Sequence, residues 1–372
     1  DSPRLGRDGK PRICLAQRPI YGMRQAGRRL QRKLLPWVKA QGLTQCFYDP
    51  CVHWKREGDD ILIVGIYVDD MMVLYRSGAA GSLYSNFSNA LHRDWEAEDE
   101  GELLDLLNIH FRQSGDSLTL HQAPYIEKLA ERFFPDGIPK RIHRNQTPHA
   151  DTLPQLVSDA QQLDPADADP VIRKRYQQLV GAILYASTQT RPDIAYATGM
   201  LSRALHKPTP ALLEAAERVL IYLHLHADIG LTYEPDPTDP HAASDSDWAL
   251  KKSTSGWAIM WHRAAINWGS KGQPVIALSS CEAEIIAASV AAKDTISVRN
   301  LVTELGFPPS GPTSQATDNK AARDLAYNPE HHDRTKHIHR RHLWIRELVE
   351  HGAITVPYVR TADNIADFFT KP

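Results

Sequence analysis

The sequence is poor in cysteine, nearly neutral overall and free of long apolar runs. Its four cysteines include no C-x-x-C pair, which gives no support to a disulfide framework or a cysteine-ligated zinc site and favours a reducing compartment. No stretch approaches the roughly 20 apolar residues of a membrane helix, so we expect no membrane partner. The formal net charge of −2 gives no reason to expect a partner selected by total charge.

Terminal signals are missing as well. The chain begins DSPRLGRDGKPR, without an initiator methionine or a secretion signal, and it ends at FFTKP, so both ends look cut from a longer protein. At roughly 150 residues per domain, its 372 residues indicate two or three domains. No internal repeat is present in the sequence.

The first 226 residues alternate between helix and strand patterns. Strands are predicted at CVHWKR, ILIVGIYV and MMVLY, the last two forming a hairpin, and on both sides of a turn at 114–116. Residues 135–170 carry six prolines and few apolar positions, which predicts a linker. Helices are predicted in residues 20–42, 81–95, 123–134, 171–187, 193–205 and 210–226.

The last third follows a definite order of elements. Three strands come first, of which the first is either LTYEP or HAASDS, and the next two are SGWAIMW and AAINWG. A long helix ending at Gly306, the strand TSQATD, two helices, the strand AITVPYV and a short helix at DNIADFFTK complete the series. This order predicts an α/β layer built on a mixed sheet.

Four acids occupy informative places on that scaffold. Asp245 lies in or just after the first strand, Glu284 near the start of the long helix, and Asp318 at the end of the fourth strand. Asp367 lies in the last helix. Strand ends and helix starts converge at one edge of an open α/β sheet. Convergent carboxylates are typical of a site for divalent cations such as Mg²⁺, and two such ions about 4 Å apart can activate a water for attack on a phosphodiester.

Each acid also has an alternative explanation when it is taken singly. Asp245 can be a solvated turn residue, Asp318 an ordinary N-cap of the helix NKAARDLAY, and Asp367 a surface acid. A capping box at SSCE accounts for Glu282 but leaves Glu284 unexplained. Taken jointly, in this order of strands and helices, the four acids favour the metal site.

The hairpin in residues 61–76 places two adjacent acids, Asp69 and Asp70, in an apolar context. Burial of an unpaired carboxylate is costly, so either cations offset the repulsion between the two acids or water reaches them. An exposed turn is the alternative, since Asp is a good turn former.

Four sequence blocks span nearly all of residues 241–372: SDSDWALKKSTSGWAI, ALSSCEAEIIAAS, TDNKAARDLAYNPEHHDRTKHIHRRHLWIRE and ADNIADFFTKP. They resemble, in family order, the ribonuclease H region of copia-type (Ty1/copia) retrotransposon Pol polyproteins. The resemblance implies a ribonuclease H-like fold and hydrolysis of the RNA strand of an RNA–DNA hybrid. Leu250 and Lys251 replace the usual Gly and acid, and Cys281 replaces Thr, but no carboxylate is lost. The family's acidic site falls on Asp245, Glu284, Asp318 and Asp367.

The first part carries blocks that resemble the reverse transcriptase of the same family. IYGMRQAGRR is similar to the family's LYGLKQAPR block, and YVDD is similar to the active-site hairpin. The resemblance implies that Asp69 and Asp70 bind Mg²⁺ beside the primer end. It also implies that Arg24, Gln25 and Tyr67 lie near the incoming nucleotide.

The polymerase site nevertheless looks incomplete in this chain. Successive side chains of a strand point opposite ways, so the site needs another carboxylate on a neighbouring strand, which the family places upstream of the LYGLKQ block. Here only Asp1 and Asp8 precede Ile20, and neither lies in an apolar strand. We expect that the chain, as given, does not copy RNA.

The stretch HHDRTKHIHRRH is rich in histidine and in basic residues. A zinc site is one interpretation, since His339 and His342 are one helical turn apart, but no further ligands complete a tetrahedral set. A basic element that contacts phosphate oxygens fits better, and RTKHI is a family block. The residues predicted to bind nucleic acid are Lys336, His337, Arg340 and Arg341.

These observations predict an α+β chain of three domains. Residues 1–145 form a partial reverse transcriptase fingers and palm, and residues 146–235 form a linker and a helical thumb or connection. Residues 236–372 form an α/β ribonuclease H-like domain, with a mixed five-stranded sheet and flanking helices.

Two functions follow as hypotheses. The first is a Pol fragment that uses Mg²⁺ or Mn²⁺ and binds RNA–DNA hybrid and primer–template nucleic acid, with deoxynucleotides as further partners of the full-length protein. The second is a degenerate retrotransposon remnant that binds nucleic acid without catalysis. The expected location is intracellular, in the cytoplasm, a virus-like particle or the nucleus, and the sequence gives no oligomeric state.

Overall fold

The computed structural model describes residues 23–76, 82–139, 147–248, 252–328 and 344–371. The chain divides into two compact units, Asp1–Gly101 and Glu102–Pro372. Within the described ranges, no helix combines the length and the apolar character that crossing a membrane requires.

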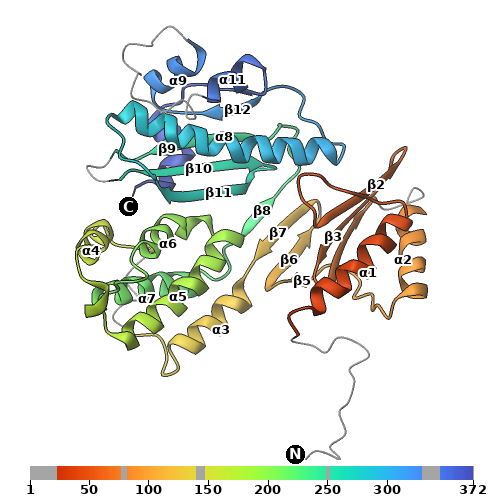
Figure 1. The fold of residues 1–372 in the computed structure, drawn as a ribbon, viewed down its shortest axis with the longest axis horizontal. Helices are drawn as coiled ribbons and strands as arrows, with labels where there is room; N and C mark the ends of the chain where they lie inside the picture. Colours follow the sequence, from red (N-terminus) through yellow and green to blue (C-terminus); the bar gives the residue numbers. More distant parts are fainter. Residues whose placement is uncertain (1–22, 77–81, 140–146, 249–251, 329–343, 372) are drawn as a thin grey trace, which may run out of the picture. The chain divides into compact units, whose positions relative to one another are not determined.

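The first unit is a four-stranded antiparallel sheet with two helices (Figure 1). Strand β3 alternates between buried and half-exposed positions, so that Leu62, Val64 and Ile66 pack against the apolar faces of the helices. The predicted strands and both helices are confirmed, although the first helix begins at Ala26 instead of residue 20. The elements are α1 (Ala26–Ala40), β1 (Thr44–Gln45), β2 (Val52–Glu57), β3 (Asp60–Tyr67), β4 (Asp70–Tyr75) and α2 (Ser82–Asp94).

The second unit begins with another antiparallel sheet and a helical bundle. The sheet contains β5 (Asp105–Leu106), β6 (Ile109–Ser114), β7 (Ser117–His121) and β8 (Leu231–Tyr233), in that order. The bundle contains α3 (Ala123–Phe133), α4 (Leu153–Ala160), α5 (Pro170–Gln189), α6 (Ala195–Ser202) and α7 (Pro210–Leu225), with 3-10 turns η2 (Pro165–Asp167) and η3 (Pro192–Ile194).

The linker prediction for residues 135–170 is wrong in its second half. Helix α4 lies inside this range, and its Leu153, Val157 and Ala160 are buried in the core of the bundle. Proline misled the sequence interpretation here, because Pro154 occupies the first turn of the helix, where its missing N–H leaves no hydrogen bond unmade.

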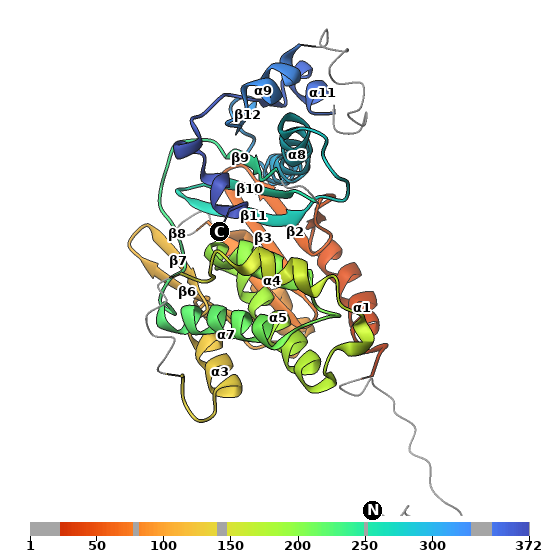
Figure 2. The same ribbon diagram turned by 90° about the vertical axis from the view of Figure 1, so that its left-hand side faces the viewer.

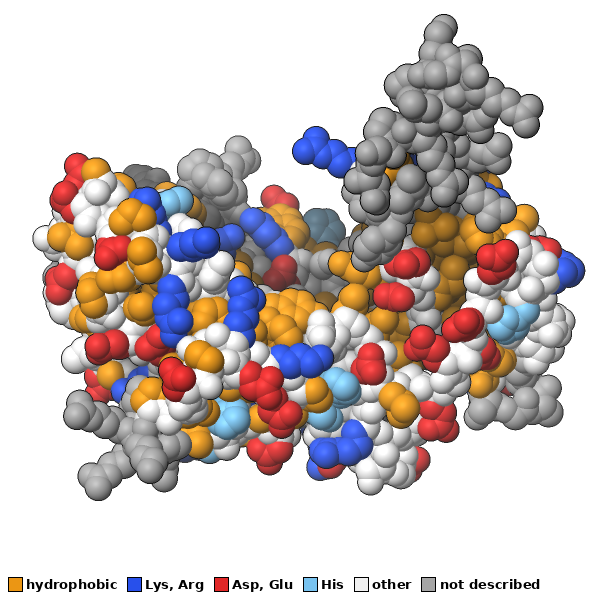
Figure 3. All heavy atoms as spheres, turned by 90° about the horizontal axis from the view of Figure 1, so that it is seen from below, with side chains coloured by type: hydrophobic (Ala, Val, Ile, Leu, Met, Phe, Trp, Pro, Cys, Tyr) orange, Lys and Arg blue, Asp and Glu red, His pale blue; other side chains and the backbone are white. Residues whose placement is uncertain are grey.

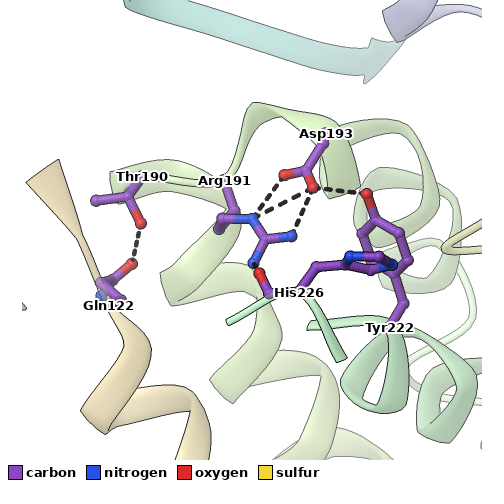
Figure 4. A network of polar contacts seen from close by, with 6 residues as sticks. All are labelled: Gln122, Thr190, Arg191, Asp193, Tyr222 and His226. Carbon is purple, nitrogen blue, oxygen red and sulfur yellow. Dashed lines mark hydrogen bonds and ion pairs between the residues drawn. The ribbon is translucent and has the colours of Figure 1, made fainter. Parts of the chain in front are cut away.

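A buried polar network ties the bundle together at the end of α5 (Figure 4). The Arg191 side chain is fully buried, donates from Nη2 to Asp193 Oδ2 at 2.6 Å and from Nη1 to the carbonyl of His226 at 2.8 Å. Tyr222 Oη donates to the same Asp193 oxygen at 2.9 Å. Since the contacts of Arg191 with the His226 carbonyl and of Asp193 with Tyr222 join the turn around η3 to the end of α7, the network fixes the direction in which the chain leaves α7 for β8.

The rest of the second unit contains the predicted mixed five-stranded sheet, whose strands lie in the order β11-β10-β9-β12-β13. Strands β9, β10 and β11 are antiparallel, whereas β12 runs parallel to both β9 and β13. Its strands are β9 (His241–Ser246), β10 (Thr254–Trp261), β11 (Ala264–Gly272), β12 (Thr313–Ala316) and β13 (Ile354–Thr355). Its helices are α8 (Ser280–Glu304), α9 (Lys320–Tyr327) and α11 (Trp344–Glu350), followed by η5 (Thr361–Asp363) and η6 (Ile365–Phe369).

Helix α8 crosses one face of this sheet (Figures 1 and 2). The short η6 packs closely on β9 and β10: a Cβ added at Gly256 would lie 2.7–2.9 Å from atoms of Ala366, Phe369 and Thr370. The C-terminal segment is therefore seated directly on β9, which carries Asp245, and on its neighbour β10.

Three details of the sequence prediction need correction. Of the two alternatives for the first strand, HAASDS is β9 of the mixed sheet, while LTY is β8 and pairs with β7 in the other sheet. The predicted strand AITVPYV pairs only at Ile354–Thr355 and at a bridge from Tyr358 to Thr317. The last short helix is a 3-10 helix.

Candidate metal centre

Three of the four predicted acids come together at one edge of the mixed sheet. Asp245, Glu284 and Asp318 each offer a carboxylate oxygen, and these oxygens all lie within 4.8 Å of one another. Among the residues that the structure describes, this is the one group of three or more His, Cys, Asp or Glu side chains with the spacing of a metal site.

The sheet topology explains why residues so far apart in sequence meet. Strands β9 and β12 are parallel neighbours, so Asp245 near the end of β9 and Asp318 just after β12 lie at the same edge. Glu284 comes from the first turns of α8, which packs against β9 and β10.

Buried side chains fix α8 against the strands. Gln273 Nε2 donates to the carbonyl of Ala283 at 2.8 Å and to Ser255 Oγ at 3.0 Å, which joins the end of β11 to α8 and β10. Gln315 Nε2, from β12, donates to the carbonyl of Ala288 at 2.9 Å. These contacts, one just before Glu284 and one a turn after it, fix the position of Glu284 relative to the strands.

Burial and mutual repulsion perturb the two deepest acids. Burial, followed by the charges of Asp245 and Asp318, raises the pKa of Glu284 to about 8, although a hydrogen bond from Ser246 opposes the shift. Burial also raises the pKa of Asp245, against a hydrogen bond from Thr370. Glu284 and Asp245 are only 6% and 2% exposed, so solvent water does little to offset the repulsion between them.

The fourth acid, Asp367, lies outside this group. Its carboxylate is paired with the Lys371 ammonium, one turn further on. Burial would lower the pKa of Lys371, but the hydrogen bond to Asp367 and the charges of Asp245, Asp367 and Asp318 outweigh it and the pKa is raised. Asp367 is close enough to raise the pKa of Asp245 by its charge. Asp367 therefore influences the group through its charge without belonging to it.

The donor set fits a divalent cation that prefers oxygen ligands. Glu284 Oε2 is buried and has no hydrogen-bond partner among the described residues, a costly condition that a bound cation would relieve. Three carboxylates without a histidine or cysteine favour Mg²⁺ or Mn²⁺ over zinc.

The alternative explanations from capping can now be judged. Asn319, and not Asp318, is the N-cap of α9, since its Oδ1 accepts from the amide of Ala322 at 3.0 Å. The capping box of α8 is half formed: Ser279 Oγ accepts from the Glu282 amide at 3.1 Å, while Glu282 Oε2 accepts from the amide of Leu278. Capping thus accounts for Glu282 and leaves both Asp318 and Glu284 for another role.

In the first unit, Asp69 and Asp70 lie at the tip of the β3–β4 hairpin, as predicted. Tyr67 pairs with Asp70, so Val68 and Asp69 form a two-residue turn, and all four side chains are exposed. Val68 has φ +58°, a strained conformation for a β-branched residue. Both acids are exposed to water at this tip, so they avoid the free-energy cost of burial that the apolar residues around them would suggest.

The residues predicted to lie near the nucleotide are exposed as well. Gln25 is the N-cap of α1, where its side chain makes no capping hydrogen bond, and Arg24 precedes it. The four residues predicted to bind nucleic acid, Lys336, His337, Arg340 and Arg341, lie outside the described residues. Figure 3 shows one face of the molecule, on which acidic, basic and exposed hydrophobic side chains are interspersed.

Sequence reasoning missed several residues that support the acidic group. Thr370 Oγ1 donates to Asp245 Oδ2, and Asn364 Nδ2 donates to the carbonyl of Ser244 at 3.1 Å. Both come from the C-terminal segment around η6. No local pattern marks them, because their partners lie more than a hundred residues earlier in the chain.

Comparison with known proteins gives consistent matches along the chain. Residues 5–137 match the family described as reverse transcriptase (RNA-dependent DNA polymerase). The chain is 32% identical to the retrovirus-related Pol polyprotein from transposon TNT 1-94 of Nicotiana tabacum, covering 97% of this chain and 27% of that protein. It is 30% identical to the retrovirus-related Pol polyprotein from transposon RE1 of Arabidopsis thaliana, covering 99% of this chain and 24% of that protein.

The chain thus spans about a quarter of the length of these two relatives. Among solved structures, it is similar to a foamy viral protease-reverse transcriptase in complex with an RNA/DNA hybrid. That match has 13% sequence identity and a TM-score of 0.46, and it covers 80% of this chain and 36% of that one.

Proposed function

Because this chain belongs to the copia-type retrotransposon Pol family, we propose that its last third hydrolyses the RNA strand of an RNA–DNA hybrid. The observation that carries the proposal is the convergence of Asp245, Glu284 and Asp318, with one buried oxygen of Glu284 lacking a partner. Buried acids that repel one another lower stability, and a protein has little reason to gather them except to hold cations.

The three carboxylates would hold Mg²⁺ or Mn²⁺, with Asp367 at the margin of the site. Two such ions, when bound, lower the pKa of an attacking water and stabilise the departing 3′ oxygen. Asp245 and Glu284 hold their positions through Thr370 and the Ser246 amide, so the ligands are oriented before the substrate arrives. Lys371 neutralises part of the acidic charge that would otherwise repel the phosphate.

The partner proposed for this site is the hybrid duplex. The 2′-hydroxyl distinguishes the RNA strand from DNA, and basic residues around Lys336 and Arg340 would contact the backbone. Each phosphate contact of this kind adds to the salt dependence of binding, so replacing either residue with alanine should weaken binding and reduce the slope against salt by about 1.

The polymerase site of this chain is proposed to be incomplete. Asp69 lies in the turn of an exposed hairpin and Asp70 at the first position of β4, and a polymerase site of this kind needs another carboxylate on a neighbouring strand. We expect no primer extension by this chain with a primed RNA template, deoxynucleotides and Mg²⁺. Extension that is lost on Asp69→Asn would show that the site is complete.

The second candidate is a remnant that binds nucleic acid without catalysis. The substitutions at Leu250, Lys251 and Cys281 favour it, whereas the intact triad opposes it. Drift would have removed one of these acids as readily as any other residue.

A cleavage assay separates the two candidates. The chain is incubated with a hybrid whose RNA strand is labelled, with Mg²⁺ or with a chelator, and beside single-stranded RNA and duplex DNA. We expect Mg²⁺-dependent cutting of the RNA in the hybrid alone, abolished in Asp245→Asn. Hybrid binding by a folded protein that makes no cut would instead favour the remnant.

A further inference from the structure

A partly buried contact joins the helical bundle to β10, the strand that follows Asp245 in the mixed sheet. Arg203 comes directly after α6, and its Nη2 donates to Thr254 Oγ1, at the start of β10, over 3.1 Å. A Cβ added at Gly272 would lie 3.3–3.4 Å from the guanidinium, so the Arg203 head packs against the backbone at the end of β11.

Thr254 also contacts an acid, Asp247, which follows β9. Its Oγ1 donates to Asp247 Oδ2 at 3.1 Å and its amide donates to Oδ1, while the Asp247 amide donates to the Thr254 carbonyl at 3.2 Å. A hydroxyl has one proton to donate and lone pairs that accept, so Thr254 can serve Arg203 and Asp247 at the same time. Guanidinium, hydroxyl and carboxylate form one continuous chain.

Asp247 lies beside the acidic triad without belonging to it. It is two residues from Asp245, and the amide of the intervening Ser246 donates to Glu284 Oε1 at 3.3 Å. A shift of the backbone at Asp247 would therefore move Asp245, which lies on the strand just before it. It would also move Glu284, which is hydrogen-bonded to the intervening Ser246 amide. An Asp247 carboxylate without Arg203 nearby would also add a further negative charge to the group.

We propose that Arg203 is a positioning residue for the acidic triad, acting through Thr254 and Asp247. This inference rests on the proposed metal site. Arg203 fixes the end of β9 and supplies the charge opposite Asp247, so the affinity for the metal depends on the docking of α6 against β11. That docking is close: a Cβ added at Gly199, on α6, would lie 2.8 Å from the carbonyl oxygen of Ser270.

The test measures Mn²⁺ binding to the full chain by titration calorimetry, together with the Mg²⁺ dependence of hybrid cleavage. Residues that share a hydrogen-bond network are energetically coupled, so Arg203→Met should weaken Mn²⁺ binding about tenfold. It should raise the Mg²⁺ concentration for half-maximal cleavage by a similar factor, with less than about a threefold change in rate at saturating Mg²⁺. Arg203→Lys keeps the positive charge but not the planar guanidinium, so its affinity for Mn²⁺ should lie between those of the wild type and Arg203→Met.

Two further variants connect the effect to the proposed path. Thr254→Val removes the bridging hydroxyl and should weaken Mn²⁺ binding in the same direction. In an Asp247→Asn background, Arg203→Met should change the affinity by less than about threefold, because the carboxylate through which it acts is gone. Arg132→Met, which removes an exposed arginine of the same bundle, is the matched control and should leave Mn²⁺ binding unchanged.

Mn²⁺ affinity within about twofold of the wild type in folded Arg203→Met and Thr254→Val would overturn the inference, as would a full Arg203→Met effect in the Asp247→Asn background. A wild-type chain that binds Mn²⁺ but leaves hybrids intact would contradict only the proposed hydrolysis, since binding still measures the role of Arg203. A wild-type chain that binds no Mn²⁺ would overturn both.

Discussion

Glu282 and Glu284 lie two residues apart near the start of α8, yet their surroundings assign them different roles. Glu282 accepts a hydrogen bond from the Leu278 amide and serves the helix terminus. Glu284 points toward two other acids and keeps one oxygen without a partner among the described atoms. Capping rules applied to the sequence separated the two correctly, because a capping box leaves a fixed place for one acid only.

Asp318→Asn tests whether the triad trades stability for metal binding. We expect Mg²⁺-dependent cleavage to fall by at least about 100-fold, since one ligand is lost. In the presence of a chelator, the same variant should be more stable by on the order of 1 kcal/mol, because a charge that repels Asp245 and Glu284 is removed.

The matched control for this variant is Asp363→Asn, which removes an exposed acid paired with Arg360 outside the group. It should leave cleavage unchanged and alter stability by less than about 1 kcal/mol. Thermal unfolding with and without Mg²⁺ measures both effects. An Asp318→Asn chain that is less stable than the wild type in chelator would contradict the repulsion argument.

The raised pKa of Glu284 predicts how the metal-free protein responds to pH. An ordinary Glu has a pKa of 4.5, whereas burial and nearby charges raise that of Glu284 to about 8 in the folded chain. Between these values the folded state keeps a proton that the unfolded state has lost, so this residue's contribution lowers stability as pH rises. The loss is at most about 1.4 kcal/mol per pH unit and levels off above the folded pKa.

Metal should reverse this trend. Below about pH 8 a cation must displace the proton from Glu284, so Mn²⁺ affinity should rise by up to about tenfold per pH unit and then level off. Calorimetry at several pH values, with Glu284→Gln as the control, measures the slope. An affinity that is flat with pH in the wild type would contradict the shifted pKa.

At the scale of elements, sequence patterns predicted those helices and strands whose formation depends on their own residues. The apolar run of β3 and the helical patterns of α5 and α7 were visible in the sequence because each element buries apolar residues of its own. Helix α4 was missed because it is short, and because its Pro154 and the prolines around it resemble those of a linker. The seat of η6 on the sheet was not predictable, since it depends on close contact with Gly256.

The Arg191 network makes a prediction at this scale. Asp193→Ala would leave a fully buried guanidinium without its carboxylate, and we expect a loss of about 3 kcal/mol in the free energy of unfolding. Glu217→Ala is a matched control, because it removes the acid from the Arg175 pair, whose arginine is partly exposed, and should cost less than about 1.5 kcal/mol.

Chemical denaturation in the presence of chelator keeps metal binding out of this comparison. Equal losses in the free energy of unfolding for the two variants would contradict the claim that the buried pair contributes more to stability than the partly exposed one. Since neither Arg191 nor Asp193 belongs to the triad, Asp193→Ala in its folded state should retain Mn²⁺ binding.

At the scale of the whole molecule, the order of elements in the sequence predicted the β3–β4 hairpin and the mixed five-stranded sheet with flanking helices, but not the pairing of β8 with β7. The same order located Asp245, Glu284 and Asp318 at one edge before any contact was known. The role of Asp367 as a fourth ligand stays a prediction, and the sequence did not reveal that its carboxylate pairs with Lys371. Pairing of this kind depends on side-chain direction, which a motif does not specify.

The most direct test of the account is to locate a divalent cation in crystals of this chain grown with Mn²⁺, by anomalous scattering. The account predicts a peak bounded by the carboxylates of Asp245, Glu284 and Asp318, which disappears in Asp318→Asn. An empty triad in crystals that hold well-ordered Mn²⁺ elsewhere would contradict it.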